Sequence, residues 1–266
     1  KGNNISFPKI SVGATENLII AACFARGIST LSNCAIEPEI KDLVNFLNKM
    51  GCKIKWKSER TLEIEGVEKI REITYSVMFD RIEAGTYLIA AAVTEGNLEI
   101  QNIIPKVIKA EINILKKIGS KIIIKKNAVQ IIGSKKIRNM KIKTAPYPGF
   151  PTDLQAQIMV LLCKANKNSI IQENIFENRF MHVAELNRMG AQILIGGNKA
   201  LVKGNINFAP AELMATDLRA SVSLVLAALT AKGKSVINRI YHLDRGYENI
   251  EVKLKKVGAK IKRVNQ

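Results

Sequence analysis

The stretch Met50-Gly51-Cys52-Lys53-Ile54 occurs in four versions along this chain, and it decides the fold. The shared glycine stands at positions 51, 119, 190 and 258, so the copies follow one another at steps of 68, 71 and 68 residues. Similarity at a fixed period indicates a repeated supersecondary unit. The other copies are Ile118-Gly119-Ser120-Lys121-Ile122, Met189-Gly190-Ala191-Gln192-Ile193 and Val257-Gly258-Ala259-Lys260-Ile261.

Each unit is predicted to contain a polar opening, an apolar first helix, a short strand, a second helix and a pair of strands. The first helices, such as residues 17–23 and 158–163, are apolar nearly all round and should be buried. The second helices, such as residues 39–50, mix apolar and polar residues, and each should end at the shared glycine in a left-handed cap. The strands that follow alternate apolar and polar residues. We therefore predict an α/β fold of repeated units with buried helices and outer sheets.

Composition argues against a membrane or nucleic-acid protein. The 266 residues are 47% hydrophobic, contain no run of 18 apolar residues and show no signal peptide. The net charge is +18, but the lysines are spread over every unit, and aromatic residues make up only 5% of the chain. The densest basic patch is residues 135–143, with five cations. A solvated lysine-rich face explains this charge better than nucleic-acid binding, and the same field would favour a small anionic substrate.

The four cysteines lie far apart and show no spacing typical of metal ligands. Cys23 and Cys163 fall inside apolar helical stretches, where a free cysteine behaves as a small buried hydrophobe. The other two are Cys34 and Cys52. We expect a reduced, cytoplasmic protein that holds no metal and no cofactor.

The polar residues that open the apolar first helices are the exception to explain. Ser11 and Thr216 are expected to be N-caps, whose side chains accept the free N–H groups of a first helical turn. Capping does not require Arg81 or Arg219, because a cation at the positive end of a helix is mildly unfavourable without a nearby anion.

The openings of both helix sets supply arginines and carboxylates that could form one charged pocket. Arginine is suited to a two-pronged grip on carboxylate or phosphate. An internal salt-bridge network is the alternative explanation for these residues. We expect His182 and His242 to be hydrogen-bonded structural residues rather than bases. The six residues of the predicted pocket are Arg179, Arg219, Arg245, Asp153, Asp217 and Glu177.

Seven motifs spread over the whole chain resemble the family of UDP-N-acetylglucosamine enolpyruvyl transferases. The sister family of 5-enolpyruvylshikimate-3-phosphate synthases shares the fold but does not combine the motifs found here at residues 176–182 and 242–251. The motifs are SVGATEN (11–17), EPEI (37–40), DRIEAGTYL (80–88), FPTDLQAQ (150–157), FENRFMH (176–182), ATDLRAS (215–221) and HLDRGYENIE (242–251).

The resemblance implies a fold and a reaction. The fold is a pair of inverse α/β barrels built from six units, of which this chain holds four. Residues 1–77 would be one unit of an incomplete barrel, and residues 78–266 would form a complete three-unit barrel. The reaction joins the enolpyruvyl group of phosphoenolpyruvate to the 3′-hydroxyl of UDP-N-acetylglucosamine and releases phosphate. It is the first committed step of bacterial peptidoglycan synthesis, and so serves cell wall biogenesis, cell shape and cell division.

The resemblance also implies roles for individual residues. Asp153 would accept the proton of the sugar hydroxyl, Arg219 and Arg245 would hold the phosphoenolpyruvate anion, and Asp217 would join them in catalysis. The remaining expected substrate contacts, the first six of them at the uridine end, are Lys9, Ile10, Ser11, Val12, Gly13, Ile175, Glu37, Arg81, Glu177 and Arg179.

The chain departs from the family pattern in its length. It opens without a methionine, and we expect it to be the carboxy-terminal two-thirds of the enzyme, lacking the loop that carries the family's reactive cysteine. None of the four cysteines replaces that residue. We therefore expect the isolated chain to be weak or inactive, and residues 1–77 to be loosely held. The alternative is a truncated module that binds a nucleotide sugar without catalysis.

Overall fold

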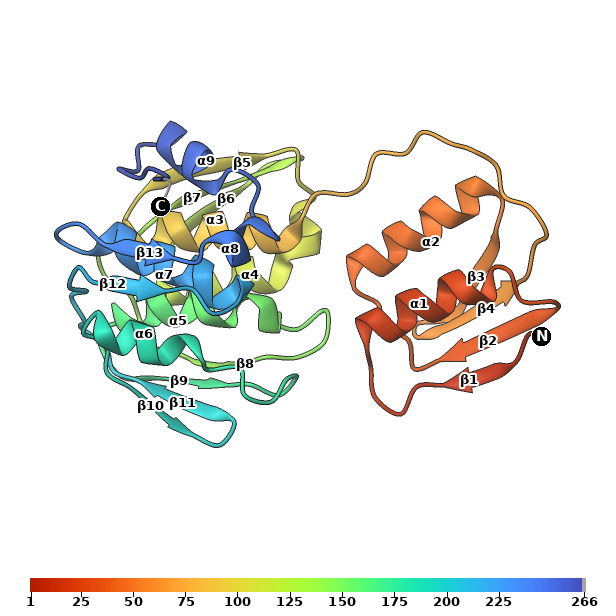
Figure 1. The fold of residues 1–266 in the computed structure, drawn as a ribbon, viewed down its shortest axis with the longest axis horizontal. Coiled ribbons are helices and arrows are strands. Elements are labelled where there is room, and N and C mark those ends of the chain that lie inside the picture. The colour runs from red at the N-terminus through yellow and green to blue at the C-terminus, as the bar shows by residue number, and fades with distance from the viewer. Residues whose placement is uncertain (265–266) are drawn as a thin grey trace. The chain divides into compact units, whose positions relative to one another are not determined.

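The chain folds into two compact units in a computed structural model that describes residues 1–264 (Figure 1). The first unit is Lys1–Phe79 together with Pro146–Pro148, and the second is Asp80–Ala145 together with Gly149–Gln266. The division falls two residues after the boundary predicted at residue 77. Sequence reasoning assigned residues 146–148 to the second domain, whereas they pack with the first unit.

The first unit is a four-stranded sheet with two helices packed on it. The strand order is β1-β2-β4-β3, in which β1 and β2 are parallel and the other neighbours are antiparallel. One apolar cluster joins both helices to the sheet. The elements are β1 (Asn4–Ser6), α1 (Val12–Ala22), β2 (Ile28–Ser32), α2 (Pro38–Met50), β3 (Lys53–Ser58) and β4 (Thr61–Glu65).

The second unit contains three repeats, and its second repeat has the same strand connection as the first unit. Its sheets have the orders β5-β7-β6, β10-β11-β9-β8 and β12-β13. The elements are α3 (Arg81–Val93), β5 (Asn97–Gln101), the 3₁₀ turn η1 (Pro105–Ile108), α4 (Lys109–Ile118), β6 (Lys121–Ile124), β7 (Ala128–Ile132), β8 (Lys141–Lys143), the 3₁₀ turn η2 (Thr152–Leu154), α5 (Gln155–Cys163), β9 (Ser169–Gln172), α6 (His182–Arg188), β10 (Ile193–Gly196), β11 (Lys199–Val202), β12 (Glu212–Met214), α7 (Leu218–Thr230), β13 (Val236–Asn238), α8 (Tyr241–Asp244) and α9 (Ile250–Lys256).

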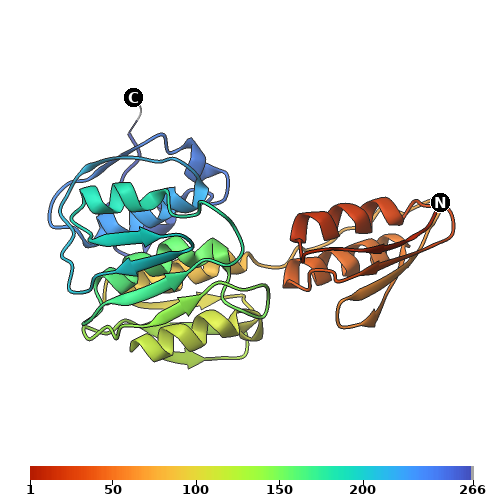
Figure 2. The same ribbon diagram turned by 90° about the horizontal axis from the view of Figure 1, so that it is seen from below.

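The first helices of the three repeats form the core of the second unit. Helices α3, α5 and α7 contact one another, and all nine residues of α5 are buried. Figures 1 and 2 show these helices in the middle of the unit and the strands toward its outside. The predicted arrangement of buried helices and outer sheets is confirmed for this unit, because helices that are apolar all round must bury every face.

Helix α1 departs from this prediction. Only three of its residues are buried; Ile20 in its last turn is 45% exposed, and Phe24, two residues beyond its end, is 52% exposed. The sequence pattern is the same as in α3, α5 and α7, but the first unit offers α1 only one sheet and one helix as neighbours. An apolar face on this scale is typical of a surface that another segment covers.

The shared glycines behave as predicted, and the strands only in part. All four have positive φ, from 91° at Gly190 to 126° at Gly119, so they end their helices in a conformation that side chains disfavour. No strand pair follows Gly258 in the described residues, although the repeat predicted one. Three strands that precede the first helices, β1, β8 and β12, were not predicted, and β8 forms the end of the basic patch.

Close packing between α3 and η2 depends on Gly85. A Cβ at this position would collide with the terminal methyl groups of Leu154, which is fully buried. Leu154 directly follows Asp153, so the glycine lets the core helix approach the turn that carries this carboxylate.

We expect Gly85→Ala to lower the free energy of unfolding by about 1–3 kcal/mol, because the added methyl group overpacks a filled core. The matched control is Gly196→Ala, since a Cβ there would meet nothing within 4 Å. Urea unfolding of both variants measures the difference. Equal stability of the two variants would show that Leu154 can move without cost.

Candidate functional site

The starts of the buried helices surround a cavity of about 380 Å³ in the second unit. Its charged lining comes from four places in the chain: η2, the turn before α6, the start of α7 and the end of α8. The six-residue pocket predicted from sequence is therefore largely present, with Glu177 the exception, since it is exposed and does not line this cavity. The charged lining residues are Asp153, Arg179, Asp217, Arg219 and Arg245.

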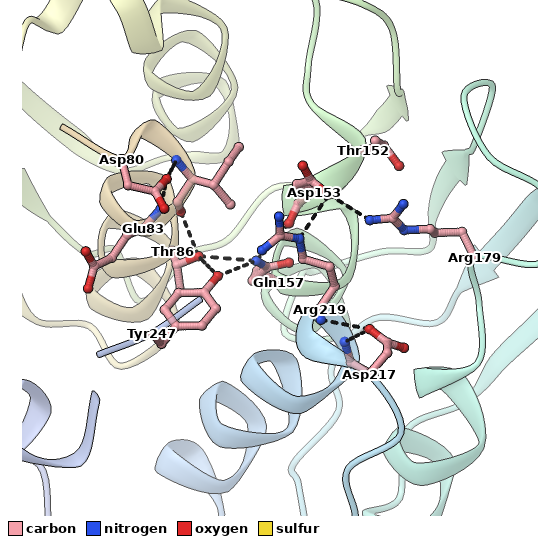
Figure 3. A network of polar contacts seen from close by, with 12 residues as sticks. Asp80, Glu83, Thr86, Thr152, Asp153, Gln157, Arg179, Asp217, Arg219 and Tyr247 are labelled. Atoms are coloured by element: carbon pink, nitrogen blue, oxygen red, sulfur yellow. Dashed lines mark hydrogen bonds and ion pairs between the residues drawn. The ribbon is translucent and has the colours of Figure 1, made fainter. Parts of the chain in front are cut away.

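Asp153 is the centre of the charged group (Figure 3). Its Oδ1 accepts from Arg179 Nη2 at 2.7 Å and from Arg219 Nε at 2.9 Å. Burial alone would raise the pKa of Asp153, but the charges and hydrogen bonds of Arg219 and then Arg179 outweigh it and hold the pKa below its usual value. These three residues thus form an ion-pair network while they line the cavity, and their roles toward a substrate stay predictions. No hydrogen bond from residues 1–264 reaches Oδ2.

Arg245 is exposed at the rim of the same cavity. The carboxylate of its neighbour Asp244 binds Arg263, whose Nη2 lies 2.5 Å from Oδ1 and whose Nη1 lies 3.0 Å from Oδ2. Within the described part of the chain Arg245 forms no ion pair. Gly246 is needed for packing, because a Cβ there would lie 2.8 Å from Leu218. Arg245 is thus a guanidinium available to an anion.

Asp217 is the N-cap of α7. Its Oδ1 accepts from the backbone N–H groups of Arg219 at 2.8 Å and Ala220 at 2.9 Å. The prediction that Thr216 caps this helix is wrong by one residue, since α7 begins at Leu218 and Asp217 therefore stands at the N-cap position. Ser11 does cap α1, accepting from Ala14 N at 3.3 Å. The catalytic role of Asp217 stays a prediction beside this structural one.

A buried polar cluster lies next to the charged group (Figure 3). Thr86 Oγ1 and Tyr247 OH are 2.8 Å apart, and Gln157 Nε2 lies 3.2 Å and 3.3 Å from these two oxygens. Gln157 Nε2 also donates to the backbone carbonyl of Asp153 at 2.9 Å. Sequence reasoning did not single out these residues. The signal was a polar side chain in an otherwise apolar helix, as Gln157 is in α5.

His182 lies in the cavity wall and is 3% exposed. Burial lowers its pKa to about 4, and the nearby Asp217 only partly opposes this shift. Its Nε2 is 3.3 Å from Met159 Sδ. A neutral, buried imidazole agrees with the expected structural role. His242 lies outside the cavity, with its ring 4.2 Å from that of Tyr241.

Two of the predicted substrate contacts have structural partners elsewhere. Arg81 is 8% exposed, does not line the cavity, and pairs with Glu111 at 3.9 Å. The structure therefore gives Arg81 a place in an internal ion pair, because α3 turns this side chain toward α4. Glu37 is buried in the first unit, where its Oε1 accepts from Tyr147 N at 3.2 Å.

The uridine-side residues occupy surface positions. In the first unit, Lys9, Ser11 and Gly13 are exposed around the start of α1, and Ile10 and Val12 are partly buried there. In the second unit, Ile175 is 37% exposed in the turn after β9. Their role in binding uridine remains a prediction.

The cysteines are all buried and free. Burial raises the pKa of the Cys163 thiol to about 12, so it is not a nucleophile at neutral pH. In residues 1–264 there is no group of three or more His, Cys, Asp and Glu side chains placed to hold a metal ion. The same residues contain no helix of the length and apolarity that crossing a bilayer requires.

We expect His182 to make the protein less stable as the pH falls from about 6.5 to about 4. The unfolded imidazole, with a pKa near 6.5, takes up a proton in this window while the folded one stays neutral, so acid favours unfolding. His182→Gln should flatten this part of the curve, and His242→Gln should not. The measurement is the melting temperature between pH 8 and pH 4; parallel curves for wild type and His182→Gln would contradict the burial argument.

Comparison with known proteins agrees with the resemblance that the seven motifs show. Residues 1–254 match the family described as EPSP synthase (3-phosphoshikimate 1-carboxyvinyltransferase). A protein from Pelagibacter ubique (strain HTCC1062), named UDP-N-acetylglucosamine 1-carboxyvinyltransferase, is 77% identical over 264 residues, which are 99% of this chain and 63% of that protein. A protein of the same name from Geotalea daltonii is 52% identical over 266 residues, covering 100% and 64%. The chain thus spans about 63% of the length of these relatives.

Solved structures show the same fold. The enolpyruvyl transferase NikO from Streptomyces tendae superposes with a TM-score of 0.91 at 24% identity, over 98% of this chain and 65% of that one. EPSP synthase from Acinetobacter baumannii superposes with a TM-score of 0.77 at 18% identity, over 100% and 64%. The family match over residues 1–254 shows that the chain belongs to the EPSP synthase (3-phosphoshikimate 1-carboxyvinyltransferase) family.

Proposed function

We propose that the protein to which this chain belongs transfers the enolpyruvyl group of phosphoenolpyruvate to the 3′-hydroxyl of UDP-N-acetylglucosamine and releases phosphate. The observation that carries the proposal is the cavity that holds Asp153, Arg219 and Arg245, the three residues that the motifs assign to the reacting groups. The 77% identity to a relative of that name supports the choice of substrates. We place the protein in the bacterial cytoplasm, in peptidoglycan synthesis.

Asp153 is suited to receive the hydroxyl proton through Oδ2, since both arginines bind Oδ1. Its lowered pKa makes it a weak base while these ion pairs persist. An anionic substrate competes for the guanidinium groups, and as they turn to it the pKa of Asp153 returns toward its ordinary value. Binding of phosphoenolpyruvate would thus prepare the base for the hydroxyl that attacks C2.

The arginines are suited to stabilise the charge that moves during the reaction. Phosphoenolpyruvate brings a carboxylate and a phosphate, and the phosphate leaves from the tetrahedral adduct with its negative charge. Arg245 is free to bind it, and Arg219, which pairs with Asp153 before the substrate binds, turns to it as that ion pair opens. Fixed cations in a partly buried site stabilise a developing anion more than mobile water does.

The proton that C3 of phosphoenolpyruvate gains must come from another group. The family resemblance assigns this step to the cysteine loop, and none of the buried thiols here can replace it. The experiment is a phosphate-release assay with both substrates, on the 266-residue chain and on a longer protein that joins it to the additional length of its Pelagibacter ubique relative. We expect turnover only in the longer protein. A lack of turnover in both proteins would refute the proposed reaction. Normal turnover by the 266-residue chain would refute the expectation that this chain lacks part of the active site.

We expect Arg245→Lys in the longer protein to lower kcat/KM for phosphoenolpyruvate by about 100-fold, because lysine keeps the charge but loses the planar two-pronged contact. The melting temperature should stay near that of the wild type, since Arg245 is exposed and forms no ion pair among the described residues. The matched control is Arg188→Lys on α6, which pairs with Glu185 at the surface. A lowered melting temperature with unchanged kinetics would assign Arg245 a structural role.

We expect Asp217→Asn to separate capping from catalysis, because asparagine caps a helix as well as aspartate does. The melting temperature should hold while turnover falls. Asp217→Ala should lower both, with a loss of about 0.5–2 kcal/mol in the free energy of unfolding from the missing cap. Full activity of Asp217→Asn would show that this residue serves only as the N-cap of α7.

A further inference from the structure

Glu173 is a buried carboxylate that no part of the proposed mechanism uses. It follows directly after β9 and is 2% exposed. Its Oε1 accepts from Thr144 Oγ1 at 2.8 Å and from the backbone N–H groups of Ile175 at 2.8 Å and Phe176 at 3.2 Å. Its Oε2 accepts from Thr152 Oγ1 at 2.9 Å. Four donors from three separate segments therefore meet on one side chain.

A buried carboxylate with four hydrogen-bond donors holds the segments that supply those donors in position. Burying an ionised group is costly unless hydrogen bonds replace the lost water, so the donors must remain in place for as long as Glu173 stays buried. The turn that supplies two of these donors is also tied to Thr144 by Asn174, whose backbone N–H donates to Thr144 Oγ1 at 2.9 Å and whose Nδ2 donates to the Thr144 carbonyl at 3.2 Å. Its apolar side chains are partly or largely in solvent, because Ile175 is 37% and Phe176 is 54% exposed. Apolar packing therefore contributes little to the position of this turn.

The segments held by Glu173 lead to both partners of one ion pair in the cavity. Thr152 directly precedes Asp153. On the other side, the ring of Phe176 lies under the guanidinium of Arg179, with 4.7 Å between the ring centroid and Cζ. Arg179 then binds Asp153 at 2.7 Å. Glu173 is thus connected to both partners of the ion pair: to Asp153 through Thr152, and to Arg179 through the turn at Phe176.

We propose that Glu173 is the positioning residue of this site, which sets the geometry of the Asp153–Arg179 ion pair through Thr152 on one side and the turn at residues 174–177 on the other. It touches no reacting atom and acts through these neighbours. The inference about the reaction rests on the proposed function, whereas the inference about the turn does not.

The primary test is amide hydrogen exchange on the 266-residue chain, which requires no activity. Glu173→Met has a similar length but accepts no hydrogen bond, so we expect exchange at Ile175 and Phe176 to rise at least about tenfold, the factor for losing one bond to a charged acceptor. Glu173→Gln keeps one acceptor oxygen and should raise exchange much less. The chain offers a matched control in Ser169→Ala, on the strand β9 that precedes Glu173, where a buried hydroxyl accepts from Met140 N at 3.2 Å.

The second readout is turnover of the longer protein with the same variants. We expect kcat to fall about tenfold or more in Glu173→Met, since small displacements of aligned groups are costly to catalysis. Glu173→Gln should recover most of it, and Ser169→Ala should lose stability but not turnover. If Glu173→Met fails to fold, Glu173→Asp replaces it, because its shorter side chain cannot reach Thr152 and the turn together.

Two results would overturn the inference. One is exchange at Ile175 and Phe176 that is as slow in Glu173→Met, or in Glu173→Asp where that replaces it, as in Ser169→Ala. The other is a Glu173→Gln variant as impaired as Glu173→Met, which would make the charge, and not the hydrogen bonds, the essential property. If the wild-type longer protein does not turn over these substrates, the proposed reaction fails while the exchange result still decides the role of Glu173.

Discussion

The mutual burial of α3, α5 and α7 is the constraint on which the rest of the second unit depends. Helices that are apolar on every face must be enclosed, so the amphipathic sheets and second helices lie outside them. The few polar residues at the helix starts are then brought together in the cavity. Asp153 and Arg219 come from the starts of different repeats and meet as an ion pair of 2.9 Å, so the site follows from the packing of the core.

The sequence predicts those features that repeat or that follow from one helix alone. The glycine caps, the apolar helices and the meeting of Asp153 with the arginines all belong to this class. The strands before the first helices span only three residues each, which is too short for alternation to show. The partner of Arg81 could not be predicted, because the pairing with Glu111 depends on how α3 and α4 pack. The local sequence pattern thus predicts which residues of an element must be buried or paired, whereas tertiary packing decides which neighbouring residues they contact.

Helix α1 shows that the burial of an apolar helix also depends on tertiary packing and not on its own sequence alone. Its sequence is as apolar as those of its counterparts, yet Ile20 remains 45% exposed in a unit that supplies a single repeat. Three repeats suffice to enclose α3, α5 and α7, whereas one cannot enclose α1.

The charge in the cavity explains why the site is suited to anions even though it contains two carboxylates. Three guanidinium groups line it against Asp153 and Asp217, and the buried His182 is neutral at physiological pH. The charge of Asp217 is directed at the N–H groups of α7 and offsets the positive end of that helix. One carboxylate then remains to balance three cations. The local excess of positive charge favours a small anion in the cavity, and Asp153 holds Arg179 and Arg219 in position through its two ion pairs.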